Sequence, residues 1–179
     1  MQYNDILDFW FVETAPSQWF ATDDTFDAEI KSRFGDLHRQ AIECELWDWR
    51  QQADGRLAEI IVLDQFSRNI FRDSPQAFAQ DAVALALAQE AIACGDDGKL
   101  PSTQRAFLYM PFMHSESPLI HQRAVELFSQ PGLEFNLKFE LRHKEIIDRF
   151  GRYPHRNAVL GRTSSAEEMA FLQEPGSSF

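Results

Sequence analysis

The sequence predicts an all-α protein, a single domain of about eight helices. Apolar residues recur at three- and four-residue steps along most of the chain, which is typical of helices with one buried face. Helix-start signals separate these segments, including serine followed by proline at residues 74–75 and 117–118. The 179 residues are enough to bury roughly two-thirds of the surface of the unfolded chain, so a core is available.

The first two expected helices are rich in aromatic residues. Asn4 can cap a short, very apolar helix that ends before the loop at residues 14–17. Residues 22–24 are expected to start a long amphipathic helix, because their acidic side chains would stand at the positive end of its dipole. Trp47 and Trp49 are expected to close that helix.

Two aromatic residues, Trp19 and Phe20, fall in the loop between these helices. They could form a surface that binds a partner, but large aromatic side chains are more often buried. We therefore expect this loop to fold back onto the core.

A third helix, capped by Asp54, is expected to run to residue 72 and to be central to the fold. One stripe of it begins apolar, with Leu57, Ile60 and Ile61, and then becomes wholly polar. The other side stays apolar, so the helix has too little polar surface to lie on the outside. The polar positions are Asp64, Gln65, Arg68, Asn69 and Arg72.

Three further helices are expected before residue 132. An alanine-rich helix should start at Ser74-Pro75 and end at Gly95. The next should start at Ser102 and be kinked or ended by Pro111, because proline cannot donate the helical hydrogen bond. The third should start at Ser117-Pro118.

The segment at residues 133–141 alternates strictly between apolar and polar residues, which by pattern alone indicates a half-buried strand. A single strand in a helical chain has no partner, however, and Leu137, Leu141 and Ile147 also suit the buried face of a helix. We therefore predict a helix that ends at Gly151.

The end of the chain is expected to be partly irregular. Pro154 disfavours helical geometry for the residue before it, so residues 152–157 should form a loop. Ser164 and Glu167 form a capping-box pattern for a last helix. We predict one domain over residues 1–173 and a tail at 174–179.

The composition excludes several classes of function. The formal net charge of −11 and the pI of about 4.8 argue against binding to nucleic acid or to anionic lipid. No long uncharged apolar stretch and no leader-like start are present, so we expect a cytoplasmic protein and no membrane partner. Cys44 and Cys94 lack metal-binding or redox spacing, and we expect both to be buried, reduced thiols.

Motifs for common cofactors and nucleophiles are also missing. The chain has no GxSxG elbow, no phosphate-binding loop and no dinucleotide GxGxxG, so no cofactor is predicted. His114, His143 and His155 are candidate acid–base groups, but no HExxH or paired-ligand spacing suggests a metal, and none is predicted. A lone histidine is more often structural.

Positive charge gathers near the end of this acidic chain. Residues 138–162 hold seven basic and three acidic residues, a net of +4, so the remainder carries −15. Arginine predominates there, and guanidinium groups bind carboxylates and phosphates through two hydrogen bonds. The alternative is that these arginines, and the Asp64–Arg68 pair of the central helix, form internal ion pairs.

Three motifs resemble a known family: LDQFSRNIFR at residues 63–72, RAFLYMPFMHSE at 105–116, and RFGRYPHRN at 149–157 with LGR at 160–162. Together they are similar to the uncharacterised bacterial domain-of-unknown-function family 924. Ser67 stands where that family is expected to have proline. The resemblance implies a tetratricopeptide-like helical bundle, and it implies no catalytic residue.

We expect a binding protein whose interior polar pocket holds a small anion or a peptide carboxylate. An enzyme that uses His114 or His143 as acid or base, oriented by Asp64 or Glu116, is the alternative. A scaffold that binds partners through exposed Trp19 and Trp49 is a further one. The predicted pocket residues are Asp64, Gln65, Arg68, Asn69, Arg72, Arg105, Tyr109, His114, Glu116, His143, Arg152, His155, Arg156 and Asn157.

Overall fold

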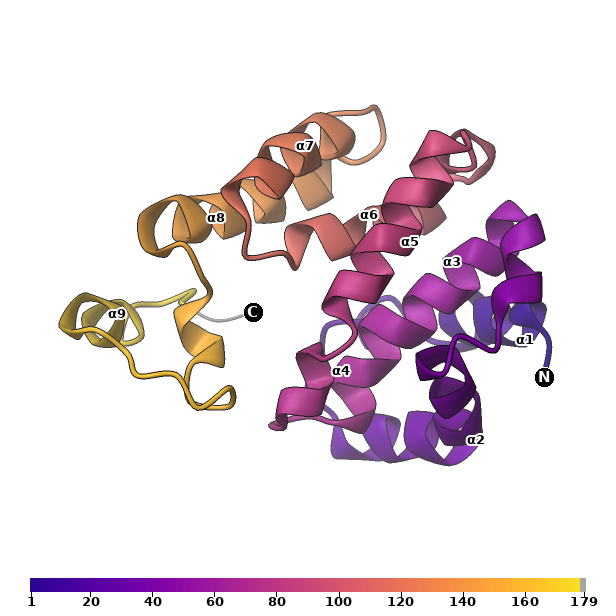
Figure 1. The fold of residues 1–179 in the computed structure, drawn as a ribbon, viewed down its shortest axis with the longest axis horizontal. Helices are drawn as coiled ribbons and strands as arrows, with labels where there is room; N and C mark the ends of the chain where they lie inside the picture. Colours follow the sequence, from indigo (N-terminus) through magenta and orange to yellow (C-terminus); the bar gives the residue numbers. More distant parts are fainter. Residues whose placement is uncertain (178–179) are drawn as a thin grey trace.

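The computed structural model describes residues 1–177, which contain helices and turns and no β-strand, so the all-α prediction is confirmed. The α-helices, shown in Figure 1, are α1 (Tyr3–Asp8), α2 (Asp24–Ile42), α3 (Ala53–Ile61), α4 (Ser67–Ile70), α5 (Asp81–Ala93), α6 (Ser102–Met113), α7 (Pro118–Phe128), α8 (Glu134–Phe150) and α9 (Ala166–Phe171). The 3-10 and π segments are η1 (Phe9–Glu13), η2 (Trp47–Gln51), η3 (Val62–Phe66), η4 (Pro75–Phe78), η5 (Asp97–Lys99) and η6 (Pro154–Arg156).

The predicted central helix is present as one rod made of α3, the π segment η3 and α4. It contacts α1, α2, α5 and α6, and Figure 1 shows it crossing the middle of the larger, N-terminal part of the molecule. Most of its apolar side chains are completely buried, as expected for a helix packed on most sides: Leu57, Ile60, Ile61, Val62, Leu63 and Phe66.

The π segment η3 interrupts this rod where its side chains change from apolar to polar. A π turn accommodates one more residue than an α turn, and such turns are frequent at functional sites. Asp64 and Gln65 both lie in it and are both buried. The local irregularity therefore marks the same place as the polar stripe.

The start of the central rod differs from the expectation. Gln52, rather than Asp54, stands at the N-cap, and α3 begins at Ala53. Asp54 falls in the first turn, where its charge still favours the positive end of the helix dipole. Close packing against η2 accounts for this shift, because the backbone of Gly55 lies directly on the carbonyl of Trp49.

We predict that Gly55→Ala lowers the free energy of unfolding by about 2 kcal/mol or more, because overpacking without room to relax is destabilising. An added Cβ would lie 2.1 Å from the Trp49 carbonyl oxygen, which is backbone and cannot rotate away. Gly35→Ala in α2 is the matched control, since its Cβ would meet nothing within 4 Å. That change should raise stability by about 0.5–1 kcal/mol. Urea unfolding of both variants measures the difference, and equal effects would contradict the prediction.

Aromatic rings fill the core around the N-terminal helices. The Trp10 ring packs edge-on against Phe66 and Phe107, at centroid distances of 5.6 and 5.7 Å. The loop carrying Trp19 folds back as predicted: its indole N–H donates to the Trp10 carbonyl at 2.8 Å, and its ring meets Phe107. Phe20 stays 64% exposed.

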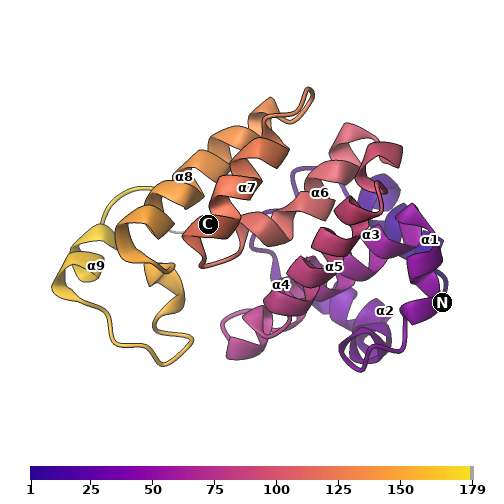
Figure 2. The ribbon, with the colours of Figure 1, turned by 45° about the horizontal axis from the view of Figure 1, so that its top comes forward.

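The C-terminal part of the molecule is built from α7, α8 and α9, and α6 connects it to the rest (Figures 1 and 2). The prediction of a helix over residues 133–141 is confirmed, since α8 runs from Glu134 to Phe150. Gly151, in the left-handed conformation at φ 67°, ends it. Ile146 and Ile147 of α8 form a small second core with Tyr153.

Several predicted boundaries are wrong at the N-terminal ends. Gln2, not Asn4, caps α1, and the capping box of α9 is Ser165 with Glu168, one residue later than expected. Ser74 does act as an N-cap, but the helix that follows is the short η4, and α5 begins only at Asp81.

The C-terminal ends of two helices also differ from the prediction. The helix α2 ends at Ile42, before Trp47 and Trp49, which belong to η2. The helix α6 continues through Pro111 to Met113, so proline neither ends it nor starts a loop there. Neighbouring buried side chains hold this turn in place, since α6 is buried from Ala106 onwards.

Both cysteines are exposed, which contradicts the prediction that they are buried. Cys94 caps the C-terminus of α5, and Cys44 follows α2 with a positive φ of 59°. At such positions the chain is turning away from the helix face that packs on the core. Both thiols are free, as expected.

The predicted tail begins at residue 174, and the structure describes it as far as residue 177, where Ser177 is buried; residues 178–179 lie outside the described part. The tetratricopeptide likeness and the domain limits stay predictions. No helix within residues 1–177 is both long and apolar enough to cross a membrane.

Candidate functional site

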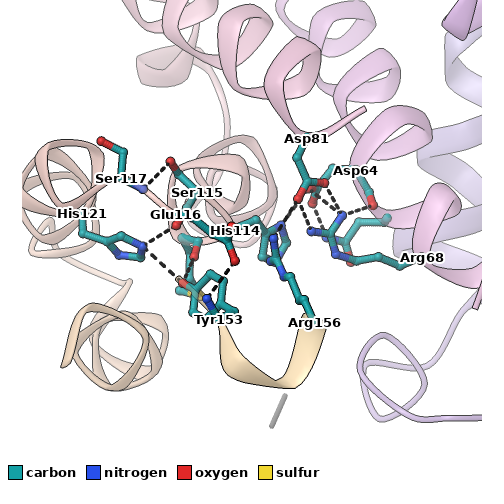
Figure 3. Close-up of polar contacts among 12 residues, drawn as sticks. Asp64, Arg68, Asp81, His114, Ser115, Glu116, Ser117, His121, Tyr153 and Arg156 are labelled. Atoms are coloured by element: carbon teal, nitrogen blue, oxygen red, sulfur yellow. Dashed lines mark hydrogen bonds and ion pairs between the residues drawn. The ribbon is translucent and has the colours of Figure 1, made fainter. Parts of the chain in front are cut away.

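Asp64 is the centre of a buried polar network that joins the central rod to the end of α6 (Figure 3). His114, the residue that caps α6, places its Nδ1 atom 2.7 Å from Asp64 Oδ1. Gln65 donates to the other carboxylate oxygen at 2.6 Å, and Arg68 Nη1 lies 3.2 Å from Oδ1. The carboxylate is therefore approached by donors from both helices.

Asp81, the first residue of α5, links two arginines (Figure 3). Arg68 donates to both of its carboxylate oxygens, at 2.9 and 3.1 Å. Arg156, from η6 in the C-terminal part, reaches one of the same oxygens at 3.2 Å. Three segments far apart in the chain thus meet at one carboxylate.

The protonation states follow from burial and from these contacts. Burial by itself would raise the pKa of Asp64, but His114 and Arg68 hold that pKa below its usual range. Burial and the neighbouring Arg68 lower the pKa of His114. At neutral pH Asp64 is therefore a carboxylate and His114 a neutral imidazole, whose Nδ1–H donates to Asp64.

The opposite ring nitrogen of His114 remains available. Among residues 1–177, no group is hydrogen-bonded to its Nε2, and the side chain is 15% exposed. A neutral histidine that donates from Nδ1 presents Nε2 as a proton acceptor. Asp64 fixes this tautomer and the orientation of the ring.

Arg156 is the least satisfied cation of the network. Its side chain is 8% exposed, its Nε has no partner among the described residues, and its contact to Asp81 uses an oxygen that Arg68 already engages. The rings of Phe78 and Tyr153 lie 4.6 and 4.5 Å from its guanidinium carbon. Burial and Arg68 lower the pKa of Arg156, so its charge is poorly compensated.

A second cluster holds the loop that carries Arg156 (Figure 3). The Tyr153 hydroxyl donates to the Met113 carbonyl at 2.6 Å, and its backbone N–H donates to Glu116 at 2.8 Å. Glu116 also accepts two bonds from Arg162, at 2.6 and 2.9 Å. These contacts tie η6 to the end of α6, and so they position Arg156 relative to His114.

His121 and Glu140 complete that cluster from α7 and α8. Their side chains are fully buried and lie 2.7 Å apart, and His121 Nε2 is 2.8 Å from the Ser115 carbonyl oxygen. Burial raises the pKa of Glu140. The packing of α7 on α8 brings the two together, and no spacing in the sequence indicates it.

The structure brings together five of the predicted site residues: Asp64, Gln65, Arg68, His114 and Arg156. Glu116 lies next to this group through Tyr153. Asp81 is not among the predicted site residues, because an acidic residue at a helix start is already explained by its favourable interaction with the helix dipole.

The remaining predicted residues make contacts elsewhere. Asn69 and Arg72 bind Asp27 of α2, at 2.7 and 2.9 Å, and Tyr109 donates to Asp97 at 2.6 Å near the start of α6. Arg105 lies about two and a half turns before His114, which caps α6. The His143 Nδ1–H donates to the Phe139 carbonyl, and His155 packs beside Tyr153. Arg152 pairs with Glu168, and Asn157 donates to Ser164.

Ser67 and His38 also meet, at 2.7 Å, but the pair is not arranged as a nucleophile and base. The Ser67 hydroxyl donates to the Leu63 carbonyl at 2.6 Å, so the histidine must be the donor in their contact. Both residues are buried, and burial lowers the pKa of His38. The pair closes the turn after the π segment.

The predicted interior pocket is not apparent around this network. Two surface hollows, of about 550 and 320 Å³, lie on α8 near Lys144 and between α1 and α2 near Arg33. Neither is lined by a residue of the network. Its side chains are instead packed against one another.

Comparison with known proteins identifies the family. A model described as a bacterial protein of unknown function, DUF924, matches residues 6–176. The chain belongs to this family. A DUF924 assignment agrees with the resemblance seen in the three sequence motifs.

A solved structure is also similar to this DUF924 chain: a protein of unknown function, ATU0120, from Agrobacterium tumefaciens. The two are 39% identical, the match covers 96% of each chain, and the TM-score is 0.91. No curated protein matches significantly. The fold is therefore shared with an uncharacterised relative, and the residues of the network are the best guide to function.

Proposed function

We propose that this protein binds a small anionic molecule, with a carboxylate or phosphate group, against Arg156 and beside His114. The observation that carries the proposal is the state of Arg156: a buried guanidinium whose Nε has no partner within residues 1–177 and which shares its one contact, to Asp81, with Arg68. A buried charged donor is costly unless it is paired. An anion would supply the missing acceptor.

The surroundings of Arg156 favour an anion that binds at the edge of the guanidinium. Phe78 and Tyr153 lie close to the guanidinium, and aromatic rings commonly cover the faces of such a group. A ligand would then have to bind the edge of the guanidinium. The edge that includes Nε carries N–H groups that can donate two hydrogen bonds to a carboxylate or phosphate. Three other arginines of the predicted pocket are less available, since Arg68, Arg72 and Arg152 already pair with carboxylates. Arg105 also has an Nε without a partner among the described residues, but it lies more than two turns before His114 on α6.

We expect inorganic phosphate, citrate or succinate to raise the thermal midpoint of the wild-type protein. At ten times its dissociation constant a ligand adds about 1.4 kcal/mol of stability. That gain corresponds to roughly 3–6 °C for a chain of this size. Arg156→Gln should abolish the shift, because it removes the guanidinium that binds the anion.

Arg152→Gln is the matched control for this experiment. Arg152 lies four residues earlier and carries the same charge, but it pairs with Glu168 outside the network. The control should therefore keep the thermal shift. If none of the three anions shifts the midpoint, or if the shift survives Arg156→Gln, the proposal is wrong.

A second candidate function is acid–base catalysis by His114, and the Asp64–His114 contact of 2.7 Å favours it. A carboxylate that orients a neutral histidine leaves Nε2 able to accept a proton from a substrate or water. Hydrolysis of p-nitrophenyl phosphate and p-nitrophenyl acetate provides a simple test. His114→Gln should lower any such rate by about 10²–10⁴-fold. A rate that is unchanged in this variant would exclude His114 as the base.

A further inference from the structure

The outward face of α8 carries a stripe of two aromatic and two basic residues. Phe135, Lys138, Phe139 and Arg142 follow one another at helical spacing, so their side chains are neighbours. Phe135 is 65% exposed and Phe139 36% exposed, and their rings lie 5.0 Å apart. We call these four residues the α8 stripe.

The opposite face of α8 already has its partners. Glu140, His143, Ile146 and Ile147 are buried, and α8 packs against α7 and α6. Figure 2 shows α7 and α8 side by side in the C-terminal part, with α8 running along its outside. The stripe is therefore additional to the surface that the fold needs for its own stability.

The two cations of the stripe are unusual for this chain. Most of its basic residues form ion pairs, including Lys144 and Arg149 on the same helix, which pair with Asp148 and Glu167. Lys138 and Arg142 are exposed, and no carboxylate among residues 1–177 lies within ion-pair distance of either. A protein with a net charge of −11 thus leaves two cations unpaired beside two exposed rings.

We propose that the α8 stripe is a docking surface for a short acidic peptide segment of a partner protein, one that also presents an apolar side chain. Acidic side chains would pair with Lys138 and Arg142, while an apolar one would cover Phe135 and Phe139. Complementary charge steers such encounters, and contiguous apolar surface supplies affinity.

The charge of the whole molecule selects this class of partner over other polyanions. Outside residues 138–162 the chain carries −15, so an extended nucleic acid or an anionic membrane would be repelled by most of its surface. A short segment needs to approach only the region around α8. Acidic helices that lie more than about 8–10 Å from the bound segment would repel it only weakly, because salt screens charges over that distance.

The test begins with selection of a displayed library of random peptides, of roughly a dozen residues, on the wild-type protein. Binding is counter-selected against Phe135→Ser/Phe139→Ser. We expect the enriched peptides to be acidic and to contain leucine or an aromatic residue. The strongest of them is then synthesised with a fluorescent label, and its affinity is measured by anisotropy.

Charge reversal supplies the quantitative comparison. Lys138→Glu/Arg142→Glu should weaken the labelled peptide at least tenfold, whereas Lys144→Glu/Arg149→Glu, at paired cations of the same helix, should weaken it less than threefold. All four stripe positions are exposed, so the thermal midpoints of the stripe variants should stay close to that of the wild type.

Other outcomes overturn the proposal. Absence of enrichment, enrichment of basic peptides, or equal weakening by the two charge reversals would each reject an acidic peptide as the occupant. Wild-type self-association that disappears in Lys138→Glu/Arg142→Glu would identify a second copy of the chain instead. Stripe-dependent binding to vesicles of phosphatidylserine and phosphatidylcholine, without peptide binding, would identify a membrane surface.

Discussion

Asp64→Asn is expected to lower the free energy of unfolding by about 3–5 kcal/mol, because removal of one partner from a buried ion pair leaves the other charge uncompensated. The substitution keeps the shape of the side chain but removes the charge that faces Arg68 and His114. Asp64 itself is 1% exposed, so water cannot take over its role. Urea unfolding followed by circular dichroism measures the loss.

Asp148→Asn provides the control for this prediction. Asp148 pairs with Lys144 on the surface of α8, where its side chain is 49% exposed. Exposed pairs of this kind contribute about 0–1 kcal/mol. If the two variants lost similar stability, the buried network would hold the helices together through packing alone, and its charges would not matter.

The network that Asp64 organises is close to neutral, and this explains how so many charges remain inside. Asp64 and Asp81 carry two negative charges, Arg68 and Arg156 carry two positive charges, and His114 is neutral at physiological pH. Asp81 contacts Arg156 through Nη1, whereas the Nε of Arg156 has no partner among the described residues. An anion at the Nε would therefore leave the contact between η6 and α5 in place.

The helices of the fold are predicted well from the sequence, because the buried face of each helix is visible in the spacing of apolar residues within that helix. The alternating segment at residues 133–141 shows where the pattern misleads. Phe135, Phe139 and Leu141 are exposed in α8, and these outward apolar residues create the resemblance to a strand. The apolar residues that suggest a buried sheet face are mostly exposed, and two of them, Phe135 and Phe139, belong to the α8 stripe.

The site is harder to predict, because its partners come from distant segments. Asp64 and His114 are 50 residues apart, and only the packing of α6 on the central rod brings them together. The five polar positions from Asp64 to Arg72 span about 140° of the helix circumference at 100° per residue. That arc is wide enough to face two neighbours, so Arg68 turns to Asp81 while Arg72 turns to Asp27.

Mild acid should lower the free energy of unfolding of this protein by more than protonation of its carboxylates alone would cause. Burial lowers the pKa of His155 to about 4 and that of His143 to about 3, from an ordinary value of 6.5. Below pH 6.5 the unfolded chain takes up protons at both histidines, whereas the folded chain does not. Stability therefore falls as the pH drops from 6.5 towards these lower values.

The expected size of this effect follows from about 1.4 kcal/mol per pKa unit. Between pH 7 and pH 5 each of these histidines should cost roughly 2 kcal/mol, and the two together roughly 4 kcal/mol. Carboxylates with lowered pKa values, such as Glu116 and Glu168, lose their contribution only at lower pH. The window from pH 7 to pH 5 therefore isolates the histidines.

Urea unfolding at pH 7, 6 and 5 measures this dependence, and His143→Gln and His155→Gln assign it. Each variant removes one group that must stay neutral in the fold, so each should reduce the loss of stability between pH 7 and pH 5 by about 2 kcal/mol. His38 and His114, whose pKa values are also lowered, add to the loss that remains. Surface carboxylates cannot produce the same loss of stability, since carboxyl groups with ordinary pKa values stay largely ionised between pH 7 and pH 5. A flat stability profile, or an equal slope in both variants and the wild type, would show that these rings accept protons within the folded core. That result would require polar groups around His143 and His155 able to stabilise two additional positive charges.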